Sequence, residues 1–178
     1  MNKNAPESLP ESATGVATAH SWKQPVSVLV VVHRPAPDDS DREILLLERI
    51  DHPGYWQSVT GSLEAGETPM EAACREIREE TGLDVRPEDL LDWHLHERYE
   101  IFPEWRHRYA PDVTHNTEHL FSLAISRAAS IRLSPAEHRA FCWQTVDRAA
   151  ALCFSPSNQT AIRALSFQSG RAKSKYPP

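Results

Sequence analysis

The sequence lacks a long hydrophobic run, and this absence excludes a membrane-spanning helix. Its longest nearly apolar stretch, residues 26–32, falls far short of the roughly 20 residues that cross a bilayer as a helix. The N-terminus has no positively charged start followed by an apolar segment, so we expect no signal peptide. We therefore expect a cytoplasmic protein without a membrane partner.

Cysteine and net positive charge are also scarce. The three cysteines, Cys74, Cys142 and Cys153, are odd in number and lack metal-ligand spacing, so we expect free, buried thiols in a reducing compartment. The 19 Lys and Arg residues are outnumbered by 25 Asp and Glu, which gives a formal net charge of −6. Because no overall positive field attracts nucleic acid, we expect no nucleic-acid partner.

The length of 178 residues suits one domain with a substantial core. Residues 1–21 are polar, rich in Ser, Ala and Pro, and without periodicity, which predicts a disordered or loosely packed extension. We expect residues 22–170 to form the domain and residues 171–178 to form a frayed basic tail. The sequence gives no indication of an oligomeric state.

Strand-like and helix-like segments follow one another within this domain, which predicts an α/β layered fold. Residues 25–32 are largely β-branched and almost wholly apolar, as is typical of a strand buried on both faces. The remaining expected strands cover residues 43–47, 90–102, 118–126 and 141–146, with a further short strand after a loop within residues 51–61. The expected helices cover residues 69–81, 147–152 and 156–167.

The clearest local signal is residues 61–83, whose centre reads as a helix with well-marked ends. Thr68 is placed to cap the first turn, and Pro69 occupies the first helical position, where its missing N–H costs nothing. Glu71, three residues after Thr68, completes a capping box. Gly82 follows the last turn as the left-handed stop.

Three carboxylates share one face of this expected helix. Glu76, Glu79 and Glu80 are spaced at i, i+3 and i+4, so they repel one another unless a positive group lies among them. Arg75 is one such group, but a single arginine cannot neutralise three charges. A divalent cation that prefers oxygen ligands can, and Mg²⁺ is the usual choice where phosphates are also bound. Taken alone, such a cluster is more often a solvated acidic helix face than a metal site.

The spacing of residues 61–83 resembles the Nudix box, G-x5-E-x7-R-E-U-x-E-E-x-G-U with U aliphatic, at every specified position. The resemblance implies a Nudix fold, an α/β/α sandwich around a central mixed β-sheet. It implies metal-assisted hydrolysis of a small-molecule triphosphate with Mg²⁺, for which Mn²⁺ can substitute. The implied metal ligands are Glu76, Glu80 and the distant Glu137, and Glu79 and Arg75 join them as catalytic residues, with Arg75 orienting Glu76 or Glu79.

Three flanking stretches, residues 23–31, 56–61 and 106–118, resemble the branch of the family that acts in bacterial folate synthesis. That resemblance implies hydrolysis of 7,8-dihydroneopterin triphosphate to dihydroneopterin monophosphate and pyrophosphate. Lys23 and Arg49 suit phosphate oxygens, and the aromatic side chains of Tyr99 and Phe102 suit a flat pterin ring. The implied substrate-binding residues are Lys23, Arg49, Thr60, Tyr99, Glu100, Ile101, Phe102 and Ser155.

Several alternatives stay open at this stage. The box is shared by broad-specificity nucleoside triphosphate pyrophosphohydrolases that cleanse the nucleotide pool. A non-catalytic Nudix ligand-binding module is a further alternative, although such modules typically lose box carboxylates and this chain keeps all of them. Glu137 has two open roles, as a metal ligand or as the base that activates water. Tyr99 and Phe102 are equally compatible with core packing.

Overall fold

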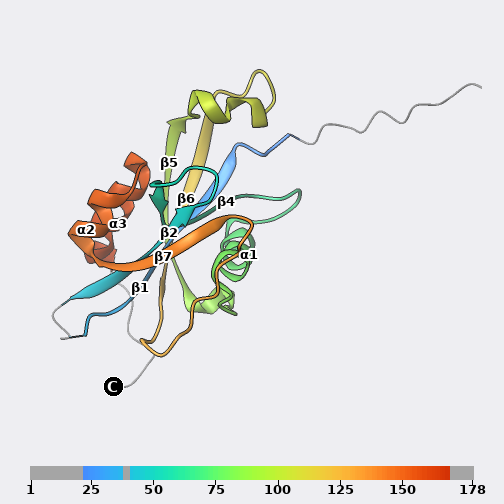
Figure 1. Ribbon diagram of the computed structural model, residues 1–178. Coiled ribbons are helices and arrows are strands. Elements are labelled where there is room, and N and C mark those ends of the chain that lie inside the picture. The colour runs from blue at the N-terminus through green and yellow to red at the C-terminus, as the bar shows by residue number, and fades with distance from the viewer. Residues whose placement is uncertain (1–21, 38–40, 169–178) are drawn as a thin grey trace, which may run out of the picture.

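The computed structural model describes residues 22–37 and 41–168. The expectations of a disordered extension at residues 1–21 and of a basic tail at residues 171–178 lie outside these described residues. Within them, one mixed sheet carries helices on both faces (Figure 1).

The elements follow the expected order along the chain. The strands are β1 (Val26–Pro35), β2 (Arg42–Arg49), β3 (Trp56–Gln57), β4 (Val59–Ser62), β5 (Leu90–Glu100), β6 (His115–Ala124) and β7 (His138–Thr145). The helices are α1 (Pro69–Thr81), α2 (Val146–Leu152) and α3 (Pro156–Gln168), together with the 3-10 turns η1 (Pro87–Asp89) and η2 (Pro103–Arg108).

The central strand β1 organises the sheet, whose main order is β3-β2-β1-β6-β5. β1 pairs in parallel with β6, whereas the other pairings between the named strands are antiparallel, so the sheet is mixed. β4 pairs with β1, and β7 pairs with β2. The side chains of Val28 to Val32 are at most 1% exposed, which confirms a strand buried on both faces.

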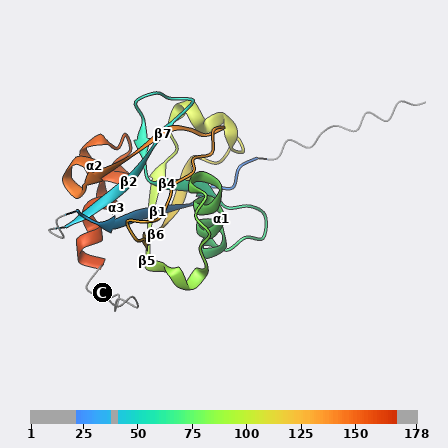
Figure 2. The same cartoon turned by 60° about the horizontal axis from the view of Figure 1, so that its bottom comes forward.

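Two apolar clusters lie on opposite faces of the sheet. One joins α1 to the sheet through Ala73 and Ile77, which pack with Val30 and Leu45. The other joins α2 and α3 to the opposite face. Figures 1 and 2 show α1 on one side of the sheet and the α2–α3 pair on the other. This arrangement confirms the predicted α/β/α sandwich.

The boundaries differ from the expectations mainly where strands run longer. β1 continues through Arg34 and Pro35, because its last residues pair with the start of β2. The expected helix 69–81 is confirmed at both ends. Cys74 and Cys153 are buried free thiols, whereas Cys142 is only half-buried. Among the described residues, no helix is long and apolar enough to cross a membrane.

Candidate active site

Helix α1 supplies the chemistry of the site, and its ends are held as the sequence predicts. The backbone N–H of Glu71 donates to the Thr68 hydroxyl at 3.3 Å, and the Thr68 N–H donates to the Glu71 carboxylate at 2.8 Å. This capping box precedes Pro69 at the first helical position. Gly82 ends the helix in the left-handed region, with φ of +69°. These caps fix where the helix begins and ends, and the packing of Ala73 and Ile77 against the sheet sets the direction of its carboxylates.

The three carboxylates of the helix do not share one environment. Glu76 and Glu80 are 7% and 2% exposed, whereas the side chain of Glu79 is 51% exposed. Burial raises the pKa of Glu76 to about 7, with the charge of Glu80 adding to the rise and the Arg75 guanidinium opposing it. Burial also raises the pKa of Glu80. The site therefore holds two carboxylates whose ionised forms are disfavoured unless a cation joins them.

Arg75 ties the box together. Its guanidinium donates to both carboxylate oxygens of Glu67 at 2.9 Å, to Glu76 at 2.8 Å and to Glu79 at 3.2 Å. It also donates to the Ser62 carbonyl oxygen at 3.1 Å. The guanidinium thus contacts both of the carboxylates that it was predicted to orient, and it anchors them to the loop before the helix.

Gly61 gives Glu76 the room that it occupies. A Cβ at this position of β4 would lie 1.7 Å from Oε1 of Glu76, so no larger residue fits without moving the carboxylate. Because β4 is paired with β1 at Val28 and Gly61, the strand itself is not free to shift. The absence of a side chain at Gly61, the first glycine of the box, therefore lets the Glu76 carboxylate occupy its place.

The loop before β7 brings a distant carboxylate to the same place. The N–H of Arg132 donates to the Thr81 carbonyl at 2.8 Å, which attaches this loop to the end of α1. The N–H groups of Glu137 and His138 both donate to the Ser134 carbonyl, at 3.1 and 3.0 Å, and form the expected turn. This turn lies where the side chains of Glu137 and His138 meet α1.

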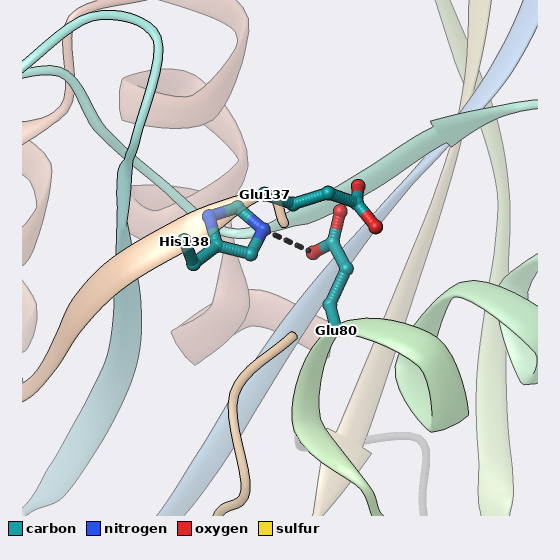
Figure 3. A group of neighbouring side chains, drawn as sticks. All are labelled: Glu80, Glu137 and His138. Atoms are coloured by element: carbon teal, nitrogen blue, oxygen red, sulfur yellow. Dashed lines mark ion pairs between the residues drawn. The ribbon is translucent and has the colours of Figure 1, made fainter. Parts of the chain in front are cut away.

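Glu80, Glu137 and His138 offer ligand atoms that all lie within 4.8 Å of one another (Figure 3). Glu80 and His138 are buried, and Glu137 is exposed. The His138 Nε2 atom lies 3.3 Å from Oε2 of Glu80, yet the pair is poorly aligned, and neither atom has a hydrogen-bond partner among the described residues. Buried polar atoms without partners fit a metal-ligand role, and two carboxylates suit a hard divalent cation.

The predicted ligand set is brought together in part. Glu80 and Glu137 belong to this cluster, whereas Glu76 lines the same cavity with its Oε1 accepting from Arg75. His138 is the member that sequence reasoning missed. Its only sequence signal is its position directly after Glu137.

This cavity, which we call the carboxylate end, has a volume of about 490 Å³. Besides the carboxylates, it is lined by the cationic side chains of Lys23, Arg49 and Arg108. Burial lowers the pKa of Lys23, and the neighbouring positive charge of Arg108 lowers it further. Clustered cations of this kind are stabilised by a bound anion.

A second cavity of about 420 Å³, which we call the ring end, adjoins the first. The two cavities share lining residues, including Lys23, Arg49, Thr60 and Arg108, so they form one cleft. Each predicted substrate-binding residue lines the ring end: Lys23, Arg49, Thr60, Tyr99, Glu100, Ile101, Phe102 and Ser155. Tyr99 and Phe102 are both half-buried, and the Tyr99 hydroxyl accepts a hydrogen bond from the Asn116 amide at 3.0 Å. Ile101 is a buried core side chain.

An aromatic group lines one side of the ring end. Phe154 lies in tilted or edge contact with Trp105 and Phe102, with ring centroids 5.7 and 6.3 Å apart, and it stacks on Tyr55 at 4.8 Å. The Arg49 guanidinium lies 5.5 Å from the centroid of the Trp105 ring. Such a surface suits a flat heterocycle. Sequence reasoning found Phe102 but missed Trp105 and Phe154, which come from separate segments.

Comparison with known proteins agrees with this geometry. A family model described as the NUDIX domain matches residues 23–165. The chain belongs to the Nudix family. It is a Nudix hydrolase that acts on a small phosphate-containing molecule, and members of this family generally use a divalent metal ion.

Its relatives within the Nudix family include two curated enzymes called dihydroneopterin triphosphate diphosphatase. The Escherichia coli enzyme is 46% identical over 143 residues, which cover 79% of this chain and 91% of the relative. The Haemophilus influenzae enzyme is 39% identical over 148 residues, with 82% and 90% covered. A solved structure of the E. coli dihydroneopterin triphosphate pyrophosphohydrolase has a TM-score of 0.73 at 44% identity, and the match covers 82% of this chain and 97% of that one.

Proposed function

We propose that this chain hydrolyses 7,8-dihydroneopterin triphosphate to dihydroneopterin monophosphate and pyrophosphate, a step of folate biosynthesis. The observation that carries the proposal is the two-part cleft, in which an aromatic-lined cavity joins a carboxylate cluster through shared cations. The similarity to the two enzymes named for this substrate extends over nine tenths of their lengths and supports it.

The carboxylate end fits Mg²⁺, which we propose as the metal, with Mn²⁺ as a substitute. Glu80 and Glu137 would hold it together with Glu76, and His138 lies within reach as a further ligand or as a partner of Glu80. When bound, the cation supplies positive charge to the phosphate oxygens that develop negative charge in the reaction. Arg75 keeps Glu76 in place through its hydrogen bond at 2.8 Å.

The other side chains of the cleft bind and orient the substrate. Lys23, Arg49 and Arg108 lie between the two cavities and would hold the phosphates. The aromatic surface at Trp105 and Phe154 would hold the pterin ring. Water then attacks a phosphorus atom, the phosphoanhydride bond breaks, and the electrons of that bond leave with pyrophosphate.

A carboxylate must accept the proton that the attacking water loses. Glu137 is exposed at the edge of the cluster and has access to solvent, so it suits this role as well as that of a ligand. The pH dependence of kcat distinguishes the two roles: loss of a base in Glu137→Gln removes the acid limb of the profile, and loss of a ligand lowers the whole profile.

A substrate panel tests the proposed function. Purified protein with Mg²⁺ is assayed against 7,8-dihydroneopterin triphosphate and the four dNTPs, and products are resolved as pyrophosphate or phosphate. We expect the highest kcat/KM for the pterin substrate, with pyrophosphate as product, and no turnover after chelation of the metal. Equal kcat/KM across all dNTPs would instead establish a broad nucleotide pyrophosphohydrolase. Absence of pyrophosphate release from every triphosphate would leave a ligand-binding module.

A further inference from the structure

Two polar residues of β6 lie buried at the ring end of the cleft. Asn116 and Glu118 are 2% and 3% exposed, and both line the ring cavity. They stand two positions apart on the strand, so their side chains project from the same face of the sheet. Neither has been given a role by the reaction described above.

Glu118 has an acceptor atom that the protein leaves unused. Its Oε2 is buried and has no hydrogen-bond partner among the described residues. Burial raises the pKa of Glu118 to about 7, the charge of Glu97 adds to the rise, and the nearby hydroxyls of Ser157, Tyr99 and Ser27 reduce it. Leaving a buried acceptor without a hydrogen-bond partner is unfavourable, because the group loses its hydration without compensation. A ligand that donates to Glu118 would remove this cost.

Asn116 adds a second unused acceptor beside it. Its amide nitrogen donates to the Ser27 hydroxyl at 2.6 Å and to the Tyr99 hydroxyl at 3.0 Å. Its Oδ1 is buried without a hydrogen-bond partner in the described part of the chain. The ring end thus presents two unpaired acceptors from neighbouring positions on one strand, which is the pattern that a ligand edge with two N–H donors would satisfy.

We propose that Glu118, with Asn116 beside it, binds an N–H donor edge of the heterocycle and makes the cleft specific for rings that carry an amino group next to a ring N–H. This inference rests on the proposed function and deepens it. A pterin offers such an edge at its 2-amino group and adjacent N3–H, and guanine offers the same edge. Adenine presents its amino group beside a bare ring nitrogen, which is an acceptor and repels a carboxylate.

The distribution of charge in the cleft also favours an orientation in which the ring of the substrate faces Glu118. Lys23, Arg49 and Arg108 lie where the two cavities meet, whereas Glu97 and Glu118 line the ring end. A triphosphate is repelled by the carboxylates of the ring end and attracted to the cations, so the ring alone is left to face Glu118. The cleft therefore orients the substrate as well as selecting it.

The test compares Glu118→Gln with wild type on three substrates: 7,8-dihydroneopterin triphosphate, dGTP and dATP. Glutamine keeps the size of the side chain but replaces one acceptor oxygen by a donor. We expect kcat/KM to fall about 10- to 100-fold for the pterin substrate and for dGTP, mainly through KM, because a hydrogen bond to a charged group contributes about 1.5–3 kcal/mol. For dATP we expect no loss, and kcat/KM can rise, because the glutamine amide no longer repels the bare ring nitrogen and can donate to it.

The matched control is Glu88→Gln, which removes one carboxylate on the exposed turn η1, where Glu88 contacts Arg86. It should leave all three substrates unchanged. An equal loss for dATP in Glu118→Gln would overturn the inference, since it would indicate a general structural effect. Unchanged kinetics for all three substrates would overturn it as well.

A second measurement uses the wild-type protein alone and does not depend on the folding of a variant. Pterin and lumazine, which has an oxo group where pterin has the 2-amino group, are compared as competitive inhibitors. We expect pterin to bind at least about tenfold more tightly than lumazine. Equal inhibition by the two compounds would contradict the proposal that Glu118 binds an N–H donor edge. If the pterin triphosphate is a poor substrate while dGTP is preferred over dATP, the proposed function fails and this inference stands.

Discussion

The two ends of the cleft differ in how their residues are supplied. Of the carboxylates at the carboxylate end, Glu76 and Glu80 come from one helix, and the Glu67–Arg75 pair that supports Glu76 lies within the same 14 residues of sequence, whereas Glu137 and His138 come from the loop before β7. At the ring end, the polar and aromatic residues come from β1, β5, η2, β6 and the segment that enters α3. Most of the proposed catalytic residues are therefore close together in the sequence, whereas the residues proposed to bind the ring are brought together only by the fold.

This difference has a physical reason. A metal site needs several charged groups at short, fixed distances, and one helix with defined caps provides them through its own periodicity. A pocket for a flat ring needs walls on opposite sides, which one segment cannot supply. The same box residues can therefore serve clefts for different rings, because most of the residues that line the ring end lie outside the box.

The largest expected effect comes from removing the charge of Glu80, which should lower catalysis at the carboxylate end without weakening ring binding at the other end. Glu80→Gln is expected to lower kcat by ~10²-fold or more, because the side chain is buried in the Glu80–Glu137–His138 cluster that we propose as the metal site, and its near-isosteric replacement would hold a cation less well. Tryptophan fluorescence titration with neopterin should show unchanged binding at the ring end. Wild-type turnover at ordinary Mg²⁺ would remove Glu80 from the catalytic machinery.

Gly61→Ala should disturb the carboxylate end through geometry alone. The added methyl group would overlap the Glu76 carboxylate, so that carboxylate must move, and we expect kcat to fall about tenfold or more. The charge of the site is unchanged, so affinity for neopterin should be unchanged too. A variant with wild-type kcat would show that the position of Glu76 is not critical.

At the ring end, Phe154→Ala should raise KM for the pterin substrate about 5- to 20-fold at nearly constant kcat, because it removes one aromatic wall. The matched control is Phe141→Ala, which removes an exposed phenylalanine of β7. If Phe154→Ala lowered kcat and left KM unchanged, the aromatic group would take part in catalysis, and the two ends would not have separate roles.

The buried carboxyl of the ring end should also make stability depend on pH. Burial raises the pKa of Glu118 from 4.5 to about 7, so the contribution of this group to folding stability is most favourable below pH 4.5 and is lost as the pH rises through about 7. Glu118→Gln removes this decline. Its Tm should exceed that of wild type by a few degrees at pH 8 and match it near pH 5, as measured by circular dichroism. An unchanged difference at the two pH values would contradict the raised pKa.

The smallest effect concerns the cap that holds the carboxylate end. Thr68→Ala should cost about 1 kcal/mol of folding free energy, which corresponds to about 2–4 °C in Tm. Activity per folded molecule should change much less than in Glu80→Gln, since the Thr68 side chain hydrogen-bonds to Glu71 within the cap and does not line the carboxylate end. A loss of kcat at unchanged Tm would show that the residue has a role beyond the cap.

The predicted elements show where local information is sufficient. Helix α1 is confirmed at both ends because Thr68, Pro69 and Gly82 each have a local conformational reason for their position. Strand ends are less well predicted: β1 runs to Pro35 since pairing with β2 extends it. Pairing depends on the partner strand, which the local pattern does not contain.

The sequence by itself determined the Nudix box, its helix and the residue types that can hold a divalent cation. Tertiary structure decided which of those residues meet: it brought Glu137 and His138 to Glu80, left Glu79 exposed, and buried Asn116 and Glu118 beneath the ring cavity. Burial alternates along the first half of β6, so Asn116 and Glu118 occupy buried positions. The sequence shows polar residues at alternate positions of a strand, but only the neighbouring strands decide which face of that strand is buried. A helix fixes the spacing of its own side chains, whereas a pocket wall is fixed only when separate segments pack together.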